Sequence, residues 1–217
     1  MDKEFKDLLE DGIKKIDSSL CTPDTLKRLC VLYDQISLFN PSLKLVAAEG
    51  RELVVRHILD SLAPSVIIRE KLKNNSSVAD LGSGSGLPGF VLASALEDLN
   101  FTLVDKMGRR IGFLRNTAAV SGMAGKIEIC QSELEKLTGK FDALVFRAFR
   151  PLKEIIGSLD KITDVGSYIF IYKSSDENIS EEVEIAEQYG KFSTEVLPYS
   201  VPFTDAKRSL LVLKKFA

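Results

Sequence analysis

The chain has 217 residues, of which 45% are hydrophobic, and its 29 basic and 31 acidic side chains give a formal net charge of −2. This length suffices for one substantial domain with an extension, and the charge argues against nucleic-acid binding by bulk charge while leaving room for a local basic surface. There is no run of eighteen apolar residues and the first residues are charged, so we expect a cytoplasmic protein without a membrane span or secretory signal.

The cysteine content gives no sign of a covalent or metal-bound framework. Cys21, Cys30 and Cys130 are odd in number and lack the paired spacing of a zinc site. We therefore expect three buried thiols and no bound metal.

The first 75 residues are predicted to be helical. Apolar residues recur at helical spacing over residues 3–17, and a second helix is expected to begin at Thr22-Pro23 and to stop at Asn40-Pro41. A third helical region over residues 49–73 should be interrupted at Ala63-Pro64. These signals indicate an N-terminal helical extension.

A short buried strand and a glycine loop follow the extension. The apolar run Val78–Leu81 leads into glycines at every second position, and Pro88 then suits the first turn of a helix. Gly82, Gly84 and Gly86 are expected to supply positive φ angles and a close approach of backbone to a ligand. The loop predicts the start of a nucleotide-type pocket.

Strand and helix patterns alternate after the loop, which predicts a parallel sheet in an α/β fold. The end of the chain differs, because Ser193–Leu197 and Ser209–Phe216 resemble two strands without a helix between them, as in an antiparallel hairpin. We predict a helical extension over residues 1–75 and a second domain over residues 76–217. The alternating segments are strands at 101–105, 126–130, 141–146 and 168–172 and helices near 109–121, 152–162 and 181–189.

The residues alone leave two ligand classes open. Gly84, Gly86 and Gly89 satisfy the dinucleotide pattern G-x-G-x-x-G, which is a weak signal by itself. Asp80 would repel a pyrophosphate, whereas the sulfonium and amino group of S-adenosylmethionine would tolerate or favour a carboxylate. Asp105 closes the next apolar run, where an acid can accept hydrogen bonds from ribose hydroxyls of either ligand.

Three segments together resemble one protein family. These are Asp80–Gly89, with the sequence DLGSGSGLPG, the preceding Arg56–Leu62, with the sequence RHILDSL, and the following Thr102–Asp105, with the sequence TLVD. They resemble the RsmG (glucose-inhibited division protein B) family over about residues 40–215. The resemblance implies a Rossmann-like class I methyltransferase fold with a mostly parallel seven-stranded sheet. It also implies S-adenosylmethionine-dependent methylation of a guanine N7 in 16S ribosomal RNA.

The resemblance also suggests site residues. Asp105 matches the family's ribose-binding acid, and the expected cofactor contacts are Asp80, Gly82, Gly84, Leu87, Asp105, Leu134, Glu135 and Arg147. The residues expected to contact substrate RNA are Arg109, Arg110, Lys173 and Arg208. Three positions depart from the family pattern, namely Lys106, Phe146 and Ser174, and the last puts the detail of the Lys173 loop in doubt.

No catalytic base is expected. His57 is the single histidine, and on an apolar helix we interpret it as a packed residue. Guanine N7 carries an in-plane lone pair and loses no proton on methylation, so positioning is the main requirement. Arg147 follows an apolar strand and is the residue with the strongest functional signal, as an anchor for a phosphate, a guanine oxygen or the cofactor carboxylate.

Other functions remain open from the residues. The alternatives are a small-molecule methyltransferase, a nicotinamide oxidoreductase, which Asp80 and the lack of a second large domain disfavour, and a non-catalytic RNA-binding module that retains the cofactor loop. Our leading interpretation names 16S ribosomal RNA or the small ribosomal subunit as partner. It expects a monomer that contacts neither membrane nor metal.

Overall fold

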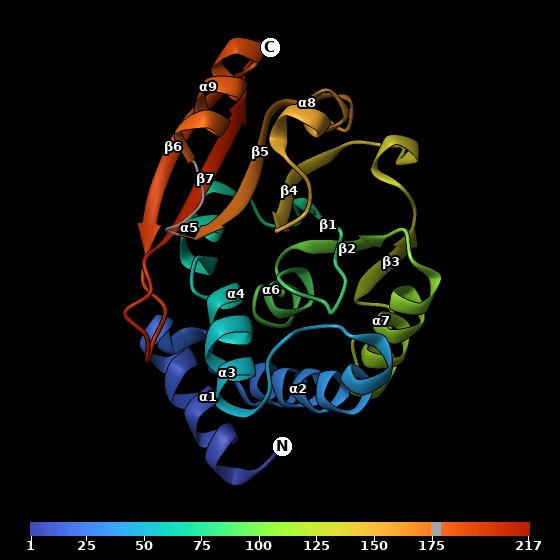
Figure 1. Ribbon diagram of the computed structural model, residues 1–217, viewed down its shortest axis with the longest axis vertical. Coiled ribbons are helices and arrows are strands. Elements are labelled where there is room, and N and C mark those ends of the chain that lie inside the picture. Colours follow the sequence, from blue (N-terminus) through green and yellow to red (C-terminus); the bar gives the residue numbers. More distant parts are fainter. Residues whose placement is uncertain (175–178) are drawn as a thin grey trace.

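The computed structural model describes residues 1–174 and 179–217, and within them one mixed sheet forms the centre of the molecule (Figure 1). Its seven strands are Ser77–Leu81 (β1), Asn100–Asp105 (β2), Ile127–Gln131 (β3), Phe141–Arg147 (β4), Thr163–Ser174 (β5), Phe192–Tyr199 (β6) and Arg208–Lys215 (β7). They lie in the order β3-β2-β1-β4-β5-β7-β6. The first five pair in parallel, whereas β7 runs antiparallel to β5 and β6. The predicted parallel sheet with a C-terminal antiparallel hairpin is confirmed.

Helices cover both faces of this sheet. They are Lys3–Ile16 (α1), Pro23–Leu43 (α2), Gly50–Leu53 (α3), Asp60–Leu62 (α4), Ser65–Lys71 (α5), Gly89–Ala95 (α6), Gly108–Ser121 (α7), Leu152–Lys161 (α8) and Ile179–Tyr189 (α9). Short 3₁₀ turns occur at Ser18–Leu20 (η1) and Leu134–Lys136 (η3), and a π-helical turn occupies Val54–Leu59 (η2). Within the described residues, no helix is long and apolar enough to cross a membrane.

Two hydrophobic clusters form the core, one on each face of the sheet. The larger cluster joins the N-terminal helices with α6, α7 and inward-facing strand residues such as Val78 and Phe170. The smaller one packs α8 and α9 against residues such as Ala79 and Ile171. Both faces of the central strands are buried, which explains why these strands are continuous apolar runs in the sequence.

The helical extension packs directly against the sheet domain. Leu32 and Ile58 of the extension belong to the same hydrophobic cluster as Phe90 of α6. Arg28 of α2 is 3% exposed, and its Nη1 donates to the carbonyl oxygen of Ser94 at 3.2 Å. The predicted elements of residues 1–75 are present, and the boundary at residue 75 stays a prediction.

One prediction about this region was wrong. Helix α2 does not stop at Asn40-Pro41 but continues to Leu43, because proline removes only one hydrogen bond when it lies in the last turn. The chain leaves the helix at Lys44, whose φ is +50°, and the side-chain oxygen of Asn40 accepts hydrogen bonds from the Leu45 and Val46 amides at 2.8 and 3.0 Å.

The cysteines are less buried than predicted. Cys21, Cys30 and Cys130 are all partly exposed free thiols. Each lies at the margin of a hydrophobic cluster instead of inside it. Strand β5 also begins at Thr163, well before the predicted start at Tyr168.

The chain order of the strands reverses at β1, which lies between β2 and β4. In open α/β sheets, such a reversal opens a crevice outside the carboxyl ends of the strands. Gly82 follows β1 here, Asp105 ends β2 and Arg147 ends β4. Arg208 begins β7 and pairs with Ser174 at the end of β5, so the antiparallel strand brings a fourth side chain to the same edge.

Candidate functional site

The loop between β1 and α6 has the backbone that its glycines predicted. Gly82, Gly84 and Gly86 adopt φ angles of +72°, +56° and +85°. The amides of Gly82 and Ser83 donate to the carbonyl oxygen of Val104 in β2, each at 2.9 Å. A side chain on Gly82 would also collide with the ring of Phe149, since its Cβ would lie 2.4 Å from Phe149 Cδ2. This loop therefore requires glycine for both conformation and space.

Asp80, in β1, holds the glycine loop through hydrogen bonds. The residue is 1% exposed, and its Oδ2 accepts hydrogen bonds from Ser83 Oγ and from the Gly89 amide, the latter at 3.0 Å. Burial raises the pKa of Asp80 to about 6, against the opposing effect of these two hydrogen bonds. The carboxyl lines neither cavity described below, so in this structure Asp80 holds the loop, and its expected contact with the cofactor stays a prediction.

A cavity of about 490 Å³ lies on the β2 side of the loop, and we call it the β2-side cavity. Leu134, Glu135 and Asp105, three of the expected cofactor contacts, line it together with Phe149. Asp105 is 3% exposed, and its two oxygens accept the Gly84 amide at 3.0 Å and the Met107 amide at 2.8 Å. A carboxylate fixed in this way presents its remaining lone pairs to hydroxyl donors in the cavity.

Glu135 is engaged by a cation from the β4–α8 loop. It pairs with Arg150, which also lies 3.6 Å from Glu154, and the bond to Arg150 lowers the pKa of Glu135. Arg150 lines the β2-side cavity as well.

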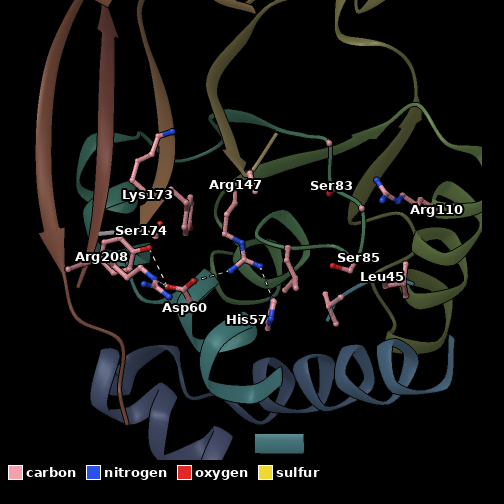
Figure 2. Close-up of a pocket in the computed structure, with 17 residues that line it drawn as sticks. Leu45, His57, Asp60, Ser83, Ser85, Arg110, Arg147, Lys173, Ser174 and Arg208 are labelled. Atoms are coloured by element: carbon pink, nitrogen blue, oxygen red, sulfur yellow. Dashed lines mark hydrogen bonds and ion pairs between the residues drawn. The ribbon is translucent and has the colours of Figure 1, made fainter. Parts of the chain in front are cut away.

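A second cavity of about 410 Å³, the β4-side cavity, lies over the ends of β4 and β5 (Figure 2). Seven of the predicted site residues line it, namely Gly82, Gly84, Leu87, Arg110, Arg147, Lys173 and Arg208. Lys173 pairs with Glu182 of α9 at 2.7 Å. Figure 2 shows the guanidinium groups of Arg147 and Arg208 directed toward Asp60.

The two cavities share Gly82, Arg110 and Ala148 as lining residues, so they adjoin above the glycine loop. Ala148 adopts a φ of +48° directly after β4. Arg110 lies 3.5 Å from Asp105, which places this predicted RNA contact at the cavity junction. Its neighbour Arg109 is exposed and lines neither cavity, so the structure separates a pair that the sequence treated as one.

Two site residues were missed or underrated in the sequence. His57 was interpreted as a packed residue and Asp60 received no role, yet both line the β4-side cavity. His57 Nδ1 lies 3.4 Å from Arg147 Nη2, and burial, followed by the charge of Arg147, lowers the pKa of His57 to about 4. The only sequence signal for them was the Arg56–Leu62 segment that carries the family resemblance.

The described residues contain no group of three or more histidine, cysteine, aspartate or glutamate side chains arranged to hold a metal ion. The polar groups that line the cavities include backbone amides and guanidinium groups, which donate hydrogen bonds, and carboxylates, which accept them. Such a set suits an organic ligand that carries hydroxyls at one end and charged groups at the other.

Comparison with known proteins gives one consistent result. Residues 25–212 match the family model of rRNA small subunit methyltransferase G. A ribosomal RNA small subunit methyltransferase G from Treponema denticola is 32% identical, over 97% of this chain and 96% of that protein. The protein of the same name from Lachnoclostridium phytofermentans is 32% identical, over 88% of this chain and 81% of that protein.

Solved structures agree with the fold. A protein of Methanococcus maripaludis, described there as a candidate S-adenosyl-L-methionine-dependent methyltransferase, superposes with a TM-score of 0.62. The alignment covers 85% of this chain and 92% of that one at 14% sequence identity. At this identity the likeness concerns the fold alone.

Proposed function

Because the chain belongs to the rRNA small subunit methyltransferase G family, we propose that it transfers the methyl group of S-adenosylmethionine to N7 of a guanine in 16S ribosomal RNA. The observation that carries this proposal is the meeting of two chemically different cavities above one glycine loop. One cavity suits an adenosine and the other a polyanionic substrate. The methyl group would pass between them.

The β2-side cavity fits the adenosyl part of the cofactor. Asp105 offers lone pairs to the ribose hydroxyls, and Leu134 and Phe149 supply apolar walls for a flat ring. The backbone at Gly84 leaves room for close approach, since the nearest atoms to an added Cβ lie 3.6 Å or more away. When bound, S-adenosylmethionine supplies an electrophilic methyl group on a sulfonium.

The β4-side cavity fits a reaction that removes no proton. The chain's single imidazole, His57, has a pKa of about 4 and is therefore a weak base. Guanine N7 attacks with an existing lone pair, so the protein has to hold N7 in line with the methyl group. Orientation of this kind contributes about 7–11 kcal/mol of barrier lowering.

Charge placement supports the same assignment. Methylation at N7 moves positive charge onto the imidazole ring of guanine, so an uncompensated arginine against the base would oppose the reaction. Arg147 instead pairs with Asp60 at 3.1 Å. We assign Arg147 to anchoring, with Arg110, Lys173 and Arg208 on the RNA side and Arg109 on a more distant RNA contact.

The proposal also covers the domain organisation, oligomeric state and cellular location of the enzyme. The helical extension, residues 1–75, and the methyltransferase domain, residues 76–217, act as one unit because they share a hydrophobic cluster. The enzyme works as a monomer on the small ribosomal subunit in the cytoplasm and uses no metal.

Transfer of tritium from labelled S-adenosylmethionine tests the proposal. Small subunits from a strain that lacks the modification should accept label in 16S RNA, and large subunits should not. Label only in free guanine nucleotides would indicate a small-molecule methyltransferase. Cofactor binding without any transfer to RNA would indicate a non-catalytic RNA-binding module.

A matched pair of glycine variants controls the assay. Gly84→Val should abolish transfer because the φ of Gly84 is +56°, a conformation that a β-branched residue rarely adopts. Gly112→Ala changes an exposed position in α7 with no atom within 4 Å of the added Cβ, and it should transfer methyl groups as the wild type does.

A further inference from the structure

Asp60 joins two arginines of the β4-side cavity. The residue is 4% exposed, and it follows the π-helical turn η2 at the start of α4. Oδ2 accepts a hydrogen bond from Arg147 Nη1 and Oδ1 accepts one from Arg208 Nε, each at 3.1 Å. The two guanidinium groups approach the carboxylate from opposite sides (Figure 2). We call Arg147 and Arg208, held by Asp60, the arginine fork.

The position of Asp60 is fixed by its neighbours. Tyr172 of β5 is buried, and its hydroxyl donates to the carbonyl oxygen of Ser61 at 2.8 Å. Ser61 Oγ in turn donates to the carbonyl oxygen of His57 at 2.6 Å. The hydroxyl of Tyr199 in β6 lies 3.5 Å from Asp60 Oδ1. Contacts from β4, β5, β6 and β7 therefore converge on one helical turn.

The fork retains capacity for a ligand. Each guanidinium has five N–H donors. The contacts of the described residues engage two donors on Arg147, toward Asp60 and His57, and two on Arg208, toward Asp60 and the Lys207 carbonyl. Two cations and one carboxylate give the arginine fork a net charge of +1. Several donors with a net positive charge favour an oxyanion.

We propose that Asp60 is a positioning residue that holds Arg147 and Arg208 as a fork for one oxyanion of the substrate. This inference rests on the proposed function and names the recognition chemistry of the same site. The oxyanion has two possible sources, a phosphate of the RNA and the carboxylate of the cofactor. Strand order favours the phosphate, because β7 lies three strands from β1, or about 14 Å at ordinary strand spacing.

Removal of the Asp60 charge distinguishes a positioning role from a purely electrostatic one, because the two roles predict opposite changes in RNA affinity. Asp60→Asn raises the net charge by one, and charge alone would then tighten RNA binding. If Asp60 positions the fork, the two arginines lose their shared partner and their geometry, and RNA binding weakens instead. The sign of the change therefore decides between the two.

Asp160 of α8 provides a matched control. It is 9% exposed and pairs with Lys191 at 2.7 Å and Lys215 at 2.6 Å, and Tyr189 donates to it at 3.1 Å. Asp160→Asn thus also removes a buried carboxylate from between two cations and raises the net charge by one. It lines neither the β2-side nor the β4-side cavity.

The experiment compares both variants with wild type in three binding measurements. The probes are a short guanosine-containing single-stranded RNA over a range of salt concentrations, S-adenosylmethionine, and its decarboxylated form. Urea unfolding of each protein reports its fold. None of these measurements requires methyl transfer, so a wild type that binds both ligands without turnover contradicts the proposed function and leaves the fork testable.

We expect Asp60→Asn to weaken RNA binding roughly tenfold to hundredfold, with a shallower salt dependence by about one phosphate contact. Asp160→Asn should leave RNA binding within about twofold of wild type. If the cofactor carboxylate is the oxyanion, Asp60→Asn instead weakens S-adenosylmethionine binding and brings it close to that of the decarboxylated form. RNA and cofactor binding that match Asp160→Asn, or tighter RNA binding, would overturn the proposal.

A second variant keeps the proposal falsifiable if Asp60→Asn does not fold. Arg208→Lys preserves the charge but loses the Nε donor that meets Asp60. Its RNA affinity should fall by about tenfold at unchanged net charge. An affinity and salt dependence equal to those of wild type would refute the fork.

Discussion

The buried carboxyl of Asp80 predicts an unusual pH dependence of stability. Burial raises its pKa from 3.8 to about 6. Since the folded state favours the protonated form, the stability that this group contributes is fully present below about pH 4 and is lost as the pH rises through about 6. The difference between the two pKa values corresponds to about 3 kcal/mol.

Asp80→Asn removes this ionisation and keeps an oxygen that can accept from Ser83 and Gly89. The free energy of unfolding of the variant, relative to wild type, should therefore rise by about 2–3 kcal/mol between about pH 4 and about pH 7. The new amide group replaces Oδ1, which is buried without a hydrogen-bond partner among the described residues. Burial of this amide changes the free energy of unfolding of the variant by the same amount at every pH. The test is therefore how the difference between variant and wild type changes with pH.

Urea unfolding of wild type and variant across this pH range measures the difference, and Asp160→Asn serves as control. Burial raises the pKa of Asp160, but bonds from Lys191, Lys215 and Tyr189 outweigh it and bring the pKa to about 2. The stability from Asp160 is present above about pH 4 and is lost as the pH falls through about 2, so its difference curve should be flat between pH 4 and 7. A flat or falling curve for Asp80→Asn would refute the reasoning.

Two further predictions concern the loop and the basic residues. Gly82→Ala should weaken cofactor binding in calorimetry by at least about tenfold, because the added Cβ lies 2.4 Å from Phe149 Cδ2 and the φ is +72°, and an affinity like that of Gly112→Ala would show that the loop tolerates a side chain. Arg110→Ala should change cofactor affinity as well as RNA affinity, since Arg110 lies 3.5 Å from Asp105, whereas Arg109→Ala should lower only RNA affinity and its salt dependence. Identical effects of the two arginine variants on cofactor binding would contradict this separation.

The sheet and most helices could be predicted because their signals are local. The strand Val78–Leu81 is apolar and bounded by polar residues and glycine, and burial on both faces requires that composition. The glycine loop was equally predictable, since positive φ angles depend on residue type. The end of α2 was not, because it depends on the side chain of Asn40 reaching the amides of Leu45 and Val46.

The site residues that escaped prediction depend on long-range contacts. Asp60 accepts hydrogen bonds from Arg147 and Arg208, which lie 87 and 148 residues further along the chain. No residue pattern near Asp60 in the sequence predicts these partners. The difference between Arg109 and Arg110 is one of helical phase at the start of α7. Neighbouring residues on a helix point about 100° apart, so only one of them faces the cavities.

The identity of the methylated nucleoside tests the central claim most directly. Small subunits that lack the modification are incubated with the protein and S-adenosylmethionine, and the 16S RNA is digested to nucleosides and analysed by mass spectrometry. The account predicts 7-methylguanosine, formed by the wild type and absent with Gly84→Val. A guanosine methylated at an exocyclic or ring nitrogen that must lose a proton would contradict it, because the account assigns methylation to a lone pair and gives no residue the role of a catalytic base.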